Sequence, residues 1–128
     1  MSLPTDNAAR KALPIFDGVV MYFPDALAAV AEVSRIGNEQ HNPGEPLHWA
    51  REKSTDQFNT ALRHLIDHAR GKVKDVDGAR HLAKAAWRVL AALQLSIEAE
   101  QKADKPPYEL YDPSCSACLQ RVGLNSKP

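Results

Sequence analysis

The sequence predicts an all-α protein, a small helical bundle of three to four main helices. Apolar residues recur at helical spacing along three long segments, and proline and glycine are concentrated between them. No segment alternates apolar and polar residues over the length of a strand. The 128 residues suit a single domain. Within it we expect an N-terminal arm over 1–21, a helical core over about 22–102 and an irregular proline-rich tail over 103–128.

The composition excludes several classes of protein. Sixteen basic and 16 acidic residues give a formal net charge of zero, so the basic surface typical of nucleic-acid-binding proteins is absent. No apolar run approaches the roughly 18 residues of a membrane-spanning helix, and the N-terminus lacks the apolar region of a secretory signal. Two cysteines cannot form a disulfide scaffold. We therefore expect a cytoplasmic protein with neither a nucleic-acid nor a membrane partner.

The first helix is expected from Pro24 to about Ile36. Proline is tolerated in the first turn of a helix, and Asp25 beside it complements the helix dipole. Gly37 follows as a C-terminal stop signal. Before this helix, the apolar residues 13–23 predict either a short helix or an extended arm.

The second helix is expected from about Thr55 to Arg70. Ser54, with Gln57 three residues later, has the pattern of a capping box, and Gly71 closes the helix. One narrow apolar stripe follows the helical repeat. It consists of Phe58, Leu62, Leu65 and Ala69.

The third helix is expected from near Gly78 to about Lys102, with Asp77 as its N-cap. Between residues 82 and 97 its apolar side chains extend almost around the cylinder. A helix that is apolar on most sides is buried on most sides. The sequence therefore predicts a central helix, an interface between copies of the chain, or both.

Two acidic residues on the first helix are candidates for metal binding. Glu32 and Glu39 are seven residues apart and would share one helix face, with Arg35 close to them. Carboxylates are the ligands that Mg²⁺ prefers. The alternative is an ordinary solvated face, and a helix that ends at Gly37 would leave Glu39 beyond it.

On the second helix His64, Asp67 and His68 follow at spacings of three and four, opposite the apolar stripe. This arrangement can place several ligands around one ion. It is equally compatible with a polar outer face.

On the third helix His81, Lys84 and Arg88 fall close together near the N-terminus. Two cations beside a helix N-terminus suit a polyphosphate, and Asp75 and Asp77 just before them add oxygen ligands. The alternative is that these cations only keep one side of an apolar helix hydrated.

The connector from Gly37 to Lys53 is expected to be a functional loop, since structureless segments of this length are uncommon in compact domains. Near its end, Trp49 would either stack on a base or anchor the loop to the bundle. In the tail, Cys115 and Cys118 form a single CxxC, which is half a zinc site and is interpreted as incidental.

Two stretches resemble phage-encoded dATP/dGTP diphosphohydrolases, which group with the MazG-like all-α nucleoside triphosphate pyrophosphohydrolases. They read FPDALAAVAEVSRIGNEQHNPGEPLHW and RHLIDHARGKVKDVDGARHLAKAAWRVLAAL, and the resemblance covers roughly residues 22–98. The elements that carry it are Glu32 followed by Gly37, the pair His48-Trp49, Arg63-His64-Leu65, and Asp75 through His81.

The resemblance implies cleavage of dGTP or dATP, with GTP as a further candidate, to the nucleoside monophosphate and pyrophosphate. It also implies Mg²⁺ or Mn²⁺ as cofactor, a homodimer or homotetramer, and a role in adjusting the nucleotide pool during phage infection, in the host cytoplasm.

The family pattern holds the metal with ExxE on one helix and ExxD on the next. Here Arg35 stands in place of the second glutamate and His64 in place of the third. The resemblance thus implies a ligand set of Glu32, Glu39, His64 and Asp67, in which Glu39 or Asp67 orients the attacking water. Substrate contacts are expected from Asn38, Asn42, Trp49, Arg63, Asp77, His81, Lys84 and Arg88. Asp75 and Asp77 are the alternative metal ligands.

Two other functions stay open at this point. One is a triphosphohydrolase of the HD type, although the chain has no His-Asp dipeptide and approaches it only with Asp67-His68 in reverse order. The other is a helical oligomer without enzymatic activity that binds a host protein through its apolar third helix.

Overall fold

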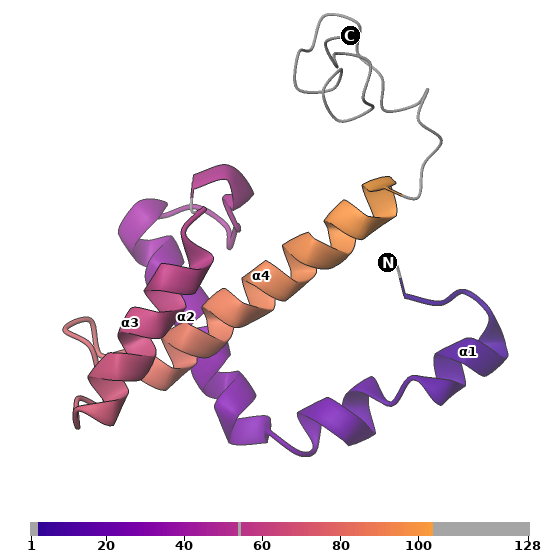
Figure 1. The fold of residues 1–128 in the computed structure, drawn as a ribbon, viewed down its shortest axis with the longest axis horizontal. Helices are drawn as coiled ribbons and strands as arrows, with labels where there is room; N and C mark the ends of the chain where they lie inside the picture. Colours follow the sequence, from indigo (N-terminus) through magenta and orange to yellow (C-terminus); the bar gives the residue numbers. More distant parts are fainter. Residues whose placement is uncertain (1–2, 54, 104–128) are drawn as a thin grey trace, which may run out of the picture. The chain divides into compact units, whose positions relative to one another are not determined.

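The computed structural model describes residues 3–53 and 55–103, and all regular structure in these ranges is helical (Figure 1). The one bridge of β type within them is isolated and joins Lys74 to Arg80. The elements are α1 (Asn7–Ala12), the π-helix η1 (Phe16–Val20), α2 (Pro24–His41), the 3₁₀-helix η2 (Arg51–Lys53), α3 (Gln57–Ala69) and α4 (His81–Ala103). The predicted all-α class is confirmed.

The described residues up to Leu93 form one compact unit, and residues 94–103, the end of α4, belong to a second. No single described helix is long and apolar enough to cross a bilayer. Asn7–Val20 and Pro24–His41 pass that test only as a pair, which is bent by 87°. The Cys115/Cys118 motif lies outside the described residues.

The N-terminal arm contains two short helical segments. α1 is capped by Asp6, whose Oδ2 accepts a hydrogen bond of 2.9 Å from the Ala9 amide. η1 then leads through a turn into α2, where the Phe23 amide donates to the Val19 carbonyl at 3.0 Å. Of the two predictions for residues 13–23, the short helix is confirmed, whereas α1 was not predicted.

α2 continues past its predicted end. Gly37 does not adopt the positive φ of a helix stop, and the helix runs on to His41. It ends where Asn42 leaves the helical conformation, and Gly44 turns the chain with a φ of +78°. The predicted loop therefore begins at Asn42 and not at Gly37, and Glu39 lies on the same helix as Glu32.

α3 matches its predicted span within two residues at the start. The predicted capping box is wrong, because the helix begins at Gln57 with Asp56 as N-cap. Ser54 lies outside the described residues. The predicted end is confirmed, since Gly71 follows with a φ of +92°, a backbone conformation that glycine adopts without steric cost.

α4 begins three residues later than predicted because residues 75–79 form a tight turn. Within it the Asp75 amide donates to the Ala79 carbonyl at 2.8 Å, and Gly78 adopts a φ of +86°. The Oδ1 of Asp77 accepts from the Ala79 amide at 3.0 Å. Asp77 therefore closes this turn rather than capping the helix.

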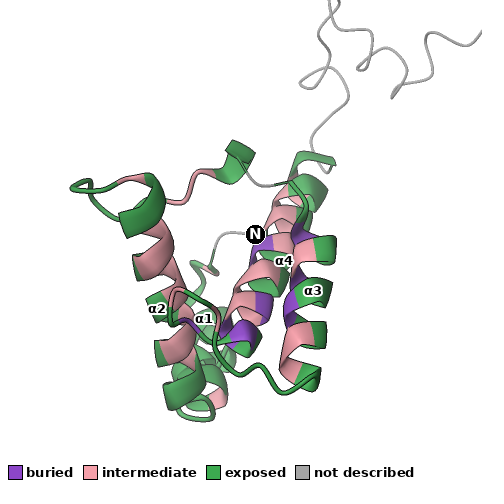
Figure 2. Cartoon of the chain, turned by 90° about the vertical axis from the view of Figure 1, so that its left-hand side faces the viewer, coloured by how far each residue is buried: buried purple, intermediate pink, exposed green. Residues whose placement is uncertain are grey.

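The buried residues lie mainly where α3 and α4 run alongside one another (Figure 2). Three of them are polar, namely Gln57, His64 and His81. The buried hydrophobic residues are all alanines, at positions 61, 79, 83, 85 and 91. No large described side chain is fully buried. A single chain therefore has only a small apolar core.

The apolar stripe of α3 faces solvent in the single chain. Phe58 is 81% exposed and Leu62 is 55% exposed, whereas His64 on the opposite side of the helix is 6% exposed. The interpretation of the histidine face as polar outer surface is wrong for His64, because α4 covers it. On α4, Val89 and Leu93 are also exposed, so these apolar faces are free to pack against another copy of the chain.

We predict that the purified protein is an oligomer and that Phe58→Lys shifts it toward the monomer, because the charge would lie on the apolar stripe of α3. Light scattering after size exclusion measures the mass. Val76→Lys is the matched control, since Val76 is fully exposed at the tip of the turn and outside the stripe. A wild-type monomer, or equal masses for wild type and Phe58→Lys, would contradict the prediction.

Candidate functional site

A cleft of about 700 Å³ is lined by the second half of α2, the following loop, α3, the 75–79 turn and the first turns of α4. Its volume lies in the range of small-molecule sites. The predicted residues that line it are Asn38, Asn42, Trp49, Arg63, His64, Asp75, Asp77, Lys84 and Arg88. Segments far apart in sequence therefore bring most of the predicted substrate contacts to one cavity.

Two tryptophans form one wall of this cleft. The rings of Trp49 and Trp87 meet edge to face with centroids 5.7 Å apart, a favourable aromatic geometry. Trp87 donates from Nε1 to Ser34 Oγ at 2.9 Å, which ties α4 to α2. The guanidinium of Arg51 covers the ring of Trp49 at 4.2 Å. Trp49 thus anchors its loop and also lines the cavity.

Asn38 holds the loop that follows α2. Its Nδ2 donates to the Glu45 carbonyl at 3.0 Å, and its Oδ1 accepts from the His48 amide at 3.3 Å. The Nδ2 of Asn42 donates to the same Oδ1 at 3.5 Å. Because its amide is committed to the loop backbone, Asn38 shapes the cleft, although the sequence suggested that it contacts the base or sugar.

Lys84 joins two carboxylates at one end of the cleft. Its Nζ lies 2.7 Å from Asp75 Oδ2 and 2.7 Å from Asp77 Oδ2, and Gln40 donates to Asp77 at 3.3 Å. Hydrogen bonding from Lys84 lowers the pKa of Asp75. Burial acts to raise the pKa of Asp77, but hydrogen bonds from Lys84 and the Ala79 amide outweigh it, so that this pKa is also lowered. Both carboxylates are therefore ionised at neutral pH.

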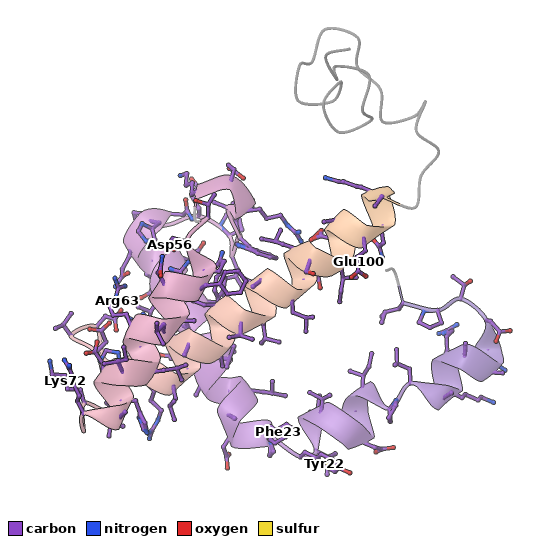
Figure 3. All side chains as sticks on the ribbon, in the orientation of Figure 1. Tyr22, Phe23, Asp56, Arg63, Lys72 and Glu100 are labelled. Atoms are coloured by element: carbon purple, nitrogen blue, oxygen red, sulfur yellow. The ribbon has the colours of Figure 1, made fainter. Side chains whose placement is uncertain are left out.

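Two arginines add positive charge to the cleft. Arg63 extends from the middle of α3 (Figure 3) and is exposed. Arg88 is half-buried on α4 and donates from Nη1 to Gln57 Oε1 at 3.3 Å. Burial lowers the pKa of Arg88, but a guanidinium stays charged in proteins. Lys84 and the exposed Lys53 also line the cleft, so the cavity has four fixed cations.

A pair of histidines is buried beside the cleft. The Nδ1 atoms of His64 and His81 are 2.9 Å apart, which is a hydrogen bond between the rings. One ring must donate and the other must accept, so the two Nδ1 atoms share one proton. Burial, aided by the charge of Lys84, lowers the pKa of His64. With Asp75 these residues form a group whose ligand atoms all lie within 4.8 Å of one another.

The acidic residues predicted on α2 form a separate cluster. Arg35 donates to both carboxylate oxygens of Glu32 and, at 2.8 Å, to Glu39 Oε1. These side chains are exposed, and hydrogen bonding from Arg35 lowers the pKa of Glu32. The prediction that the two glutamates share a face is confirmed, but Arg35 occupies the position between them.

The predicted metal set does not converge in the described chain. Glu32, Glu39 and Asp67 are absent from the cleft lining, whereas His64 lies beside Asp75 and His81. Arg35 bonds to both glutamates, and neither of them lines the cleft, so they do not form an ion site with His64 in this arrangement. The donor set of two imidazoles and one carboxylate does fit.

Sequence reasoning missed the contribution of three residues. The sequence predicted Trp87 only as part of the apolar surface of the third helix, yet Trp87 lines the cleft. It predicted Gln57 only as part of a helix cap, yet Gln57 accepts a hydrogen bond from Arg88. Gln40 was not considered at all. The one signal in the sequence was Trp87 itself. The Nε1–H of a buried tryptophan usually has a hydrogen-bond partner, so a polar contact to another helix could have been expected.

A family model described as dATP/dGTP diphosphohydrolase, N-terminal, matches residues 5–106. The chain belongs to this family. Its description names a hydrolase that acts on purine deoxynucleotides, in agreement with the resemblance found in the sequence. Neither the comparison with curated proteins nor that with solved structures gives a match.

We predict that Lys84→Met lowers the free energy of unfolding at pH 7 by about 1–3 kcal/mol, because two carboxylates lose their shared donor. Urea unfolding with EDTA present measures this, and the exposed Lys72 provides the matched control Lys72→Met. The folded-state pKa of each aspartate lies below the ordinary 3.8. The two aspartates therefore stabilise the folded state above that pH, and this stabilisation is lost as the pH falls through their folded-state pKa values. A difference in the free energy of unfolding between wild type and variant that does not narrow as the pH falls below 3.8 would contradict the prediction.

Proposed function

We propose that the chain hydrolyses dATP or dGTP, with GTP as a further candidate, between the α- and β-phosphates. The products are the nucleoside monophosphate and pyrophosphate. The observation that carries the proposal is the single cleft that combines four cations, two tryptophans and two ionised aspartates. These are the groups needed for a triphosphate, a base and an attacking water.

Lys84, Arg63 and Arg88 are proposed to bind the phosphates. Phosphoryl transfer depends mainly on positioning and on neutralising charge at the phosphate oxygens. Arg88 is oriented by Gln57, and its guanidinium offers paired donors that suit phosphate oxygens. Lys84 reaches the cleft from the first turn of α4. Charge that builds up on the departing pyrophosphate would be neutralised by these groups.

Trp49 and Trp87 are proposed to bind the purine. Their rings line the cleft, and base stacking on aromatic side chains stabilises bound nucleotides by about 1–3 kcal/mol per base. Asn42 lines the same part of the cavity and offers an amide to the base or sugar. Asn38 acts indirectly by holding the loop.

Asp77 is proposed to orient the attacking water. Its carboxylate lines the cleft and is ionised at neutral pH. The water oxygen bonds to the α-phosphorus, the bond from that phosphorus to the bridging oxygen of the β-phosphate breaks, and the water proton passes to the carboxylate. A divalent cation, Mg²⁺ or Mn²⁺, supplies further charge neutralisation and a more acidic water when bound. Glu39 and Asp67, which were predicted for this role, lie outside the cleft lining of the single chain.

The assembly and biological setting belong to the same proposal. The exposed apolar faces of α3 and α4 support a homodimer or homotetramer. A cytoplasmic enzyme of this activity would adjust the purine deoxynucleotide pool, and in a phage it would act in the host cytoplasm.

The deciding experiment incubates the protein with each nucleoside triphosphate and with Mg²⁺ or Mn²⁺, and separates the products by anion exchange. Monophosphate and pyrophosphate in equal amounts are expected from dATP or dGTP. Nucleoside and triphosphate would assign the chain to HD-type chemistry. No turnover with either metal would contradict an enzymatic function and favour a helical binding protein.

We predict that Arg63→Ala lowers kcat/KM by about 10- to 100-fold, because a charge-assisted hydrogen bond contributes about 1.5–3 kcal/mol. Steady-state kinetics with the preferred nucleotide measures the change. Arg70→Ala is the matched control, since Arg70 ends the same helix and does not line the cleft. Equal losses in both variants would show that general charge, and not the cleft, is responsible.

A further inference from the structure

The cluster of the buried His64 and His81 with the partly buried Asp75 has no part in the reaction steps proposed above. It brings together side chains from α3, the 75–79 turn and the first residue of α4. His64 and His81 are 6% and 4% exposed. Buried imidazole nitrogens need hydrogen-bond partners or a bound ion, because a buried polar group without a partner lowers the stability of the fold.

The geometry of the two imidazoles resembles that of adjacent metal ligands. Their Nδ1 atoms are 2.9 Å apart. Two nitrogens bound about 2.1 Å from one ion, at a right angle, are separated by about 3 Å. In the metal-free protein the space between these atoms holds one proton. For both Nδ1 atoms to bind an ion, the donating ring must move that proton to its Nε2.

We propose that His64, Asp75 and His81 bind a divalent transition-metal ion, with Mn²⁺, Co²⁺ or Zn²⁺ preferred over Mg²⁺. Imidazole ligands favour these ions, whereas Mg²⁺ is bound mainly through oxygen atoms. His64 and Asp75 line the cleft, so the ion would lie at its edge. The inference deepens the proposed function by naming the ion's ligands, and it rests on that function only for the ion's role in turnover.

Lys84 is the internal competitor for this ion. Its ammonium lies 2.7 Å from Asp75 Oδ2 and 2.7 Å from Asp77 Oδ2, so its one positive charge is shared between the two carboxylates. A divalent ion on Asp75 would repel the ammonium over a few ångströms. Lys84 also lines the cleft, so its side chain can turn toward bound phosphates when the ion takes its place.

Metal binding alone tests the site without reference to turnover. The full chain is freed of metal with EDTA and titrated separately with Mn²⁺, Co²⁺, Zn²⁺ and Mg²⁺ by calorimetry, and the visible absorption of bound Co²⁺ is recorded. We expect one transition-metal ion per chain, bound at least about tenfold more tightly than Mg²⁺. Equal affinity for Mg²⁺, or no binding of any ion, would overturn the proposal.

Substitutions locate the ion. His64→Gln, His81→Gln and Asp75→Asn should each weaken Co²⁺ binding by at least about 10- to 100-fold. His68→Gln is the matched control, since His68 lies one turn further along α3 and outside the cluster. Loss of binding in His68→Gln or Glu32→Gln, with binding retained in His81→Gln, would place the ion elsewhere and overturn the assignment.

Lys84→Met gives a result that a purely structural histidine pair would not produce. Removing the competing ammonium should tighten Co²⁺ binding by about tenfold or more, and this test remains decisive where a histidine variant fails to fold. Unchanged or weaker Co²⁺ binding in Lys84→Met would contradict the role of Lys84 as a competitor for the ion.

Co²⁺ binding without nucleotide turnover would support the metal site and refute the proposed hydrolase activity. Turnover with Co²⁺ binding unaffected by the cluster variants would refute the site alone.

Discussion

The hydrogen bond between the buried rings of His64 and His81 is the interaction on which the rest of the site depends. It joins the middle of α3 to the first residue of α4, and it lies where a helical pair would ordinarily place large apolar side chains. The buried hydrophobic residues of the described chain are all alanines, so the two helices gain little from apolar burial. Polar pairing therefore sets the register of α3 against α4.

This arrangement explains why the apolar side chains of both helices remain exposed. A helix that turns His64 inward must turn Phe58 and Leu62 outward, because they lie on opposite sides of the cylinder. The single chain thus buries its histidine pair and leaves its larger hydrophobic side chains exposed for contact between copies. Assembly and site formation are two consequences of the same helix orientation.

The 75–79 turn connects the buried pair to the cleft. By delaying the start of α4, it places Asp75 and Asp77 where Lys84 reaches both. Had the helix begun at Gly78, as its sequence suggested, Asp77 would have been its N-cap. The turn instead places Asp77 beside Asp75 in a charged group that lines the cleft, and Lys84 has both a structural role and a proposed role in substrate binding.

The sequence alone determined the helical class, the approximate spans of α2, α3 and α4, the family, and a set of substrate contacts most of which line the cleft. These features follow from local periodicity and from the order of motifs, which can be read from the sequence without knowing how the helices pack. Tertiary structure decided which face of each helix is buried, because that depends on partners distant in sequence. It left Glu32 and Glu39 outside the cleft lining, where they pair with Arg35, and it placed His64 beside His81 of another helix. Spacing along one helix cannot reveal a ligand that another helix supplies.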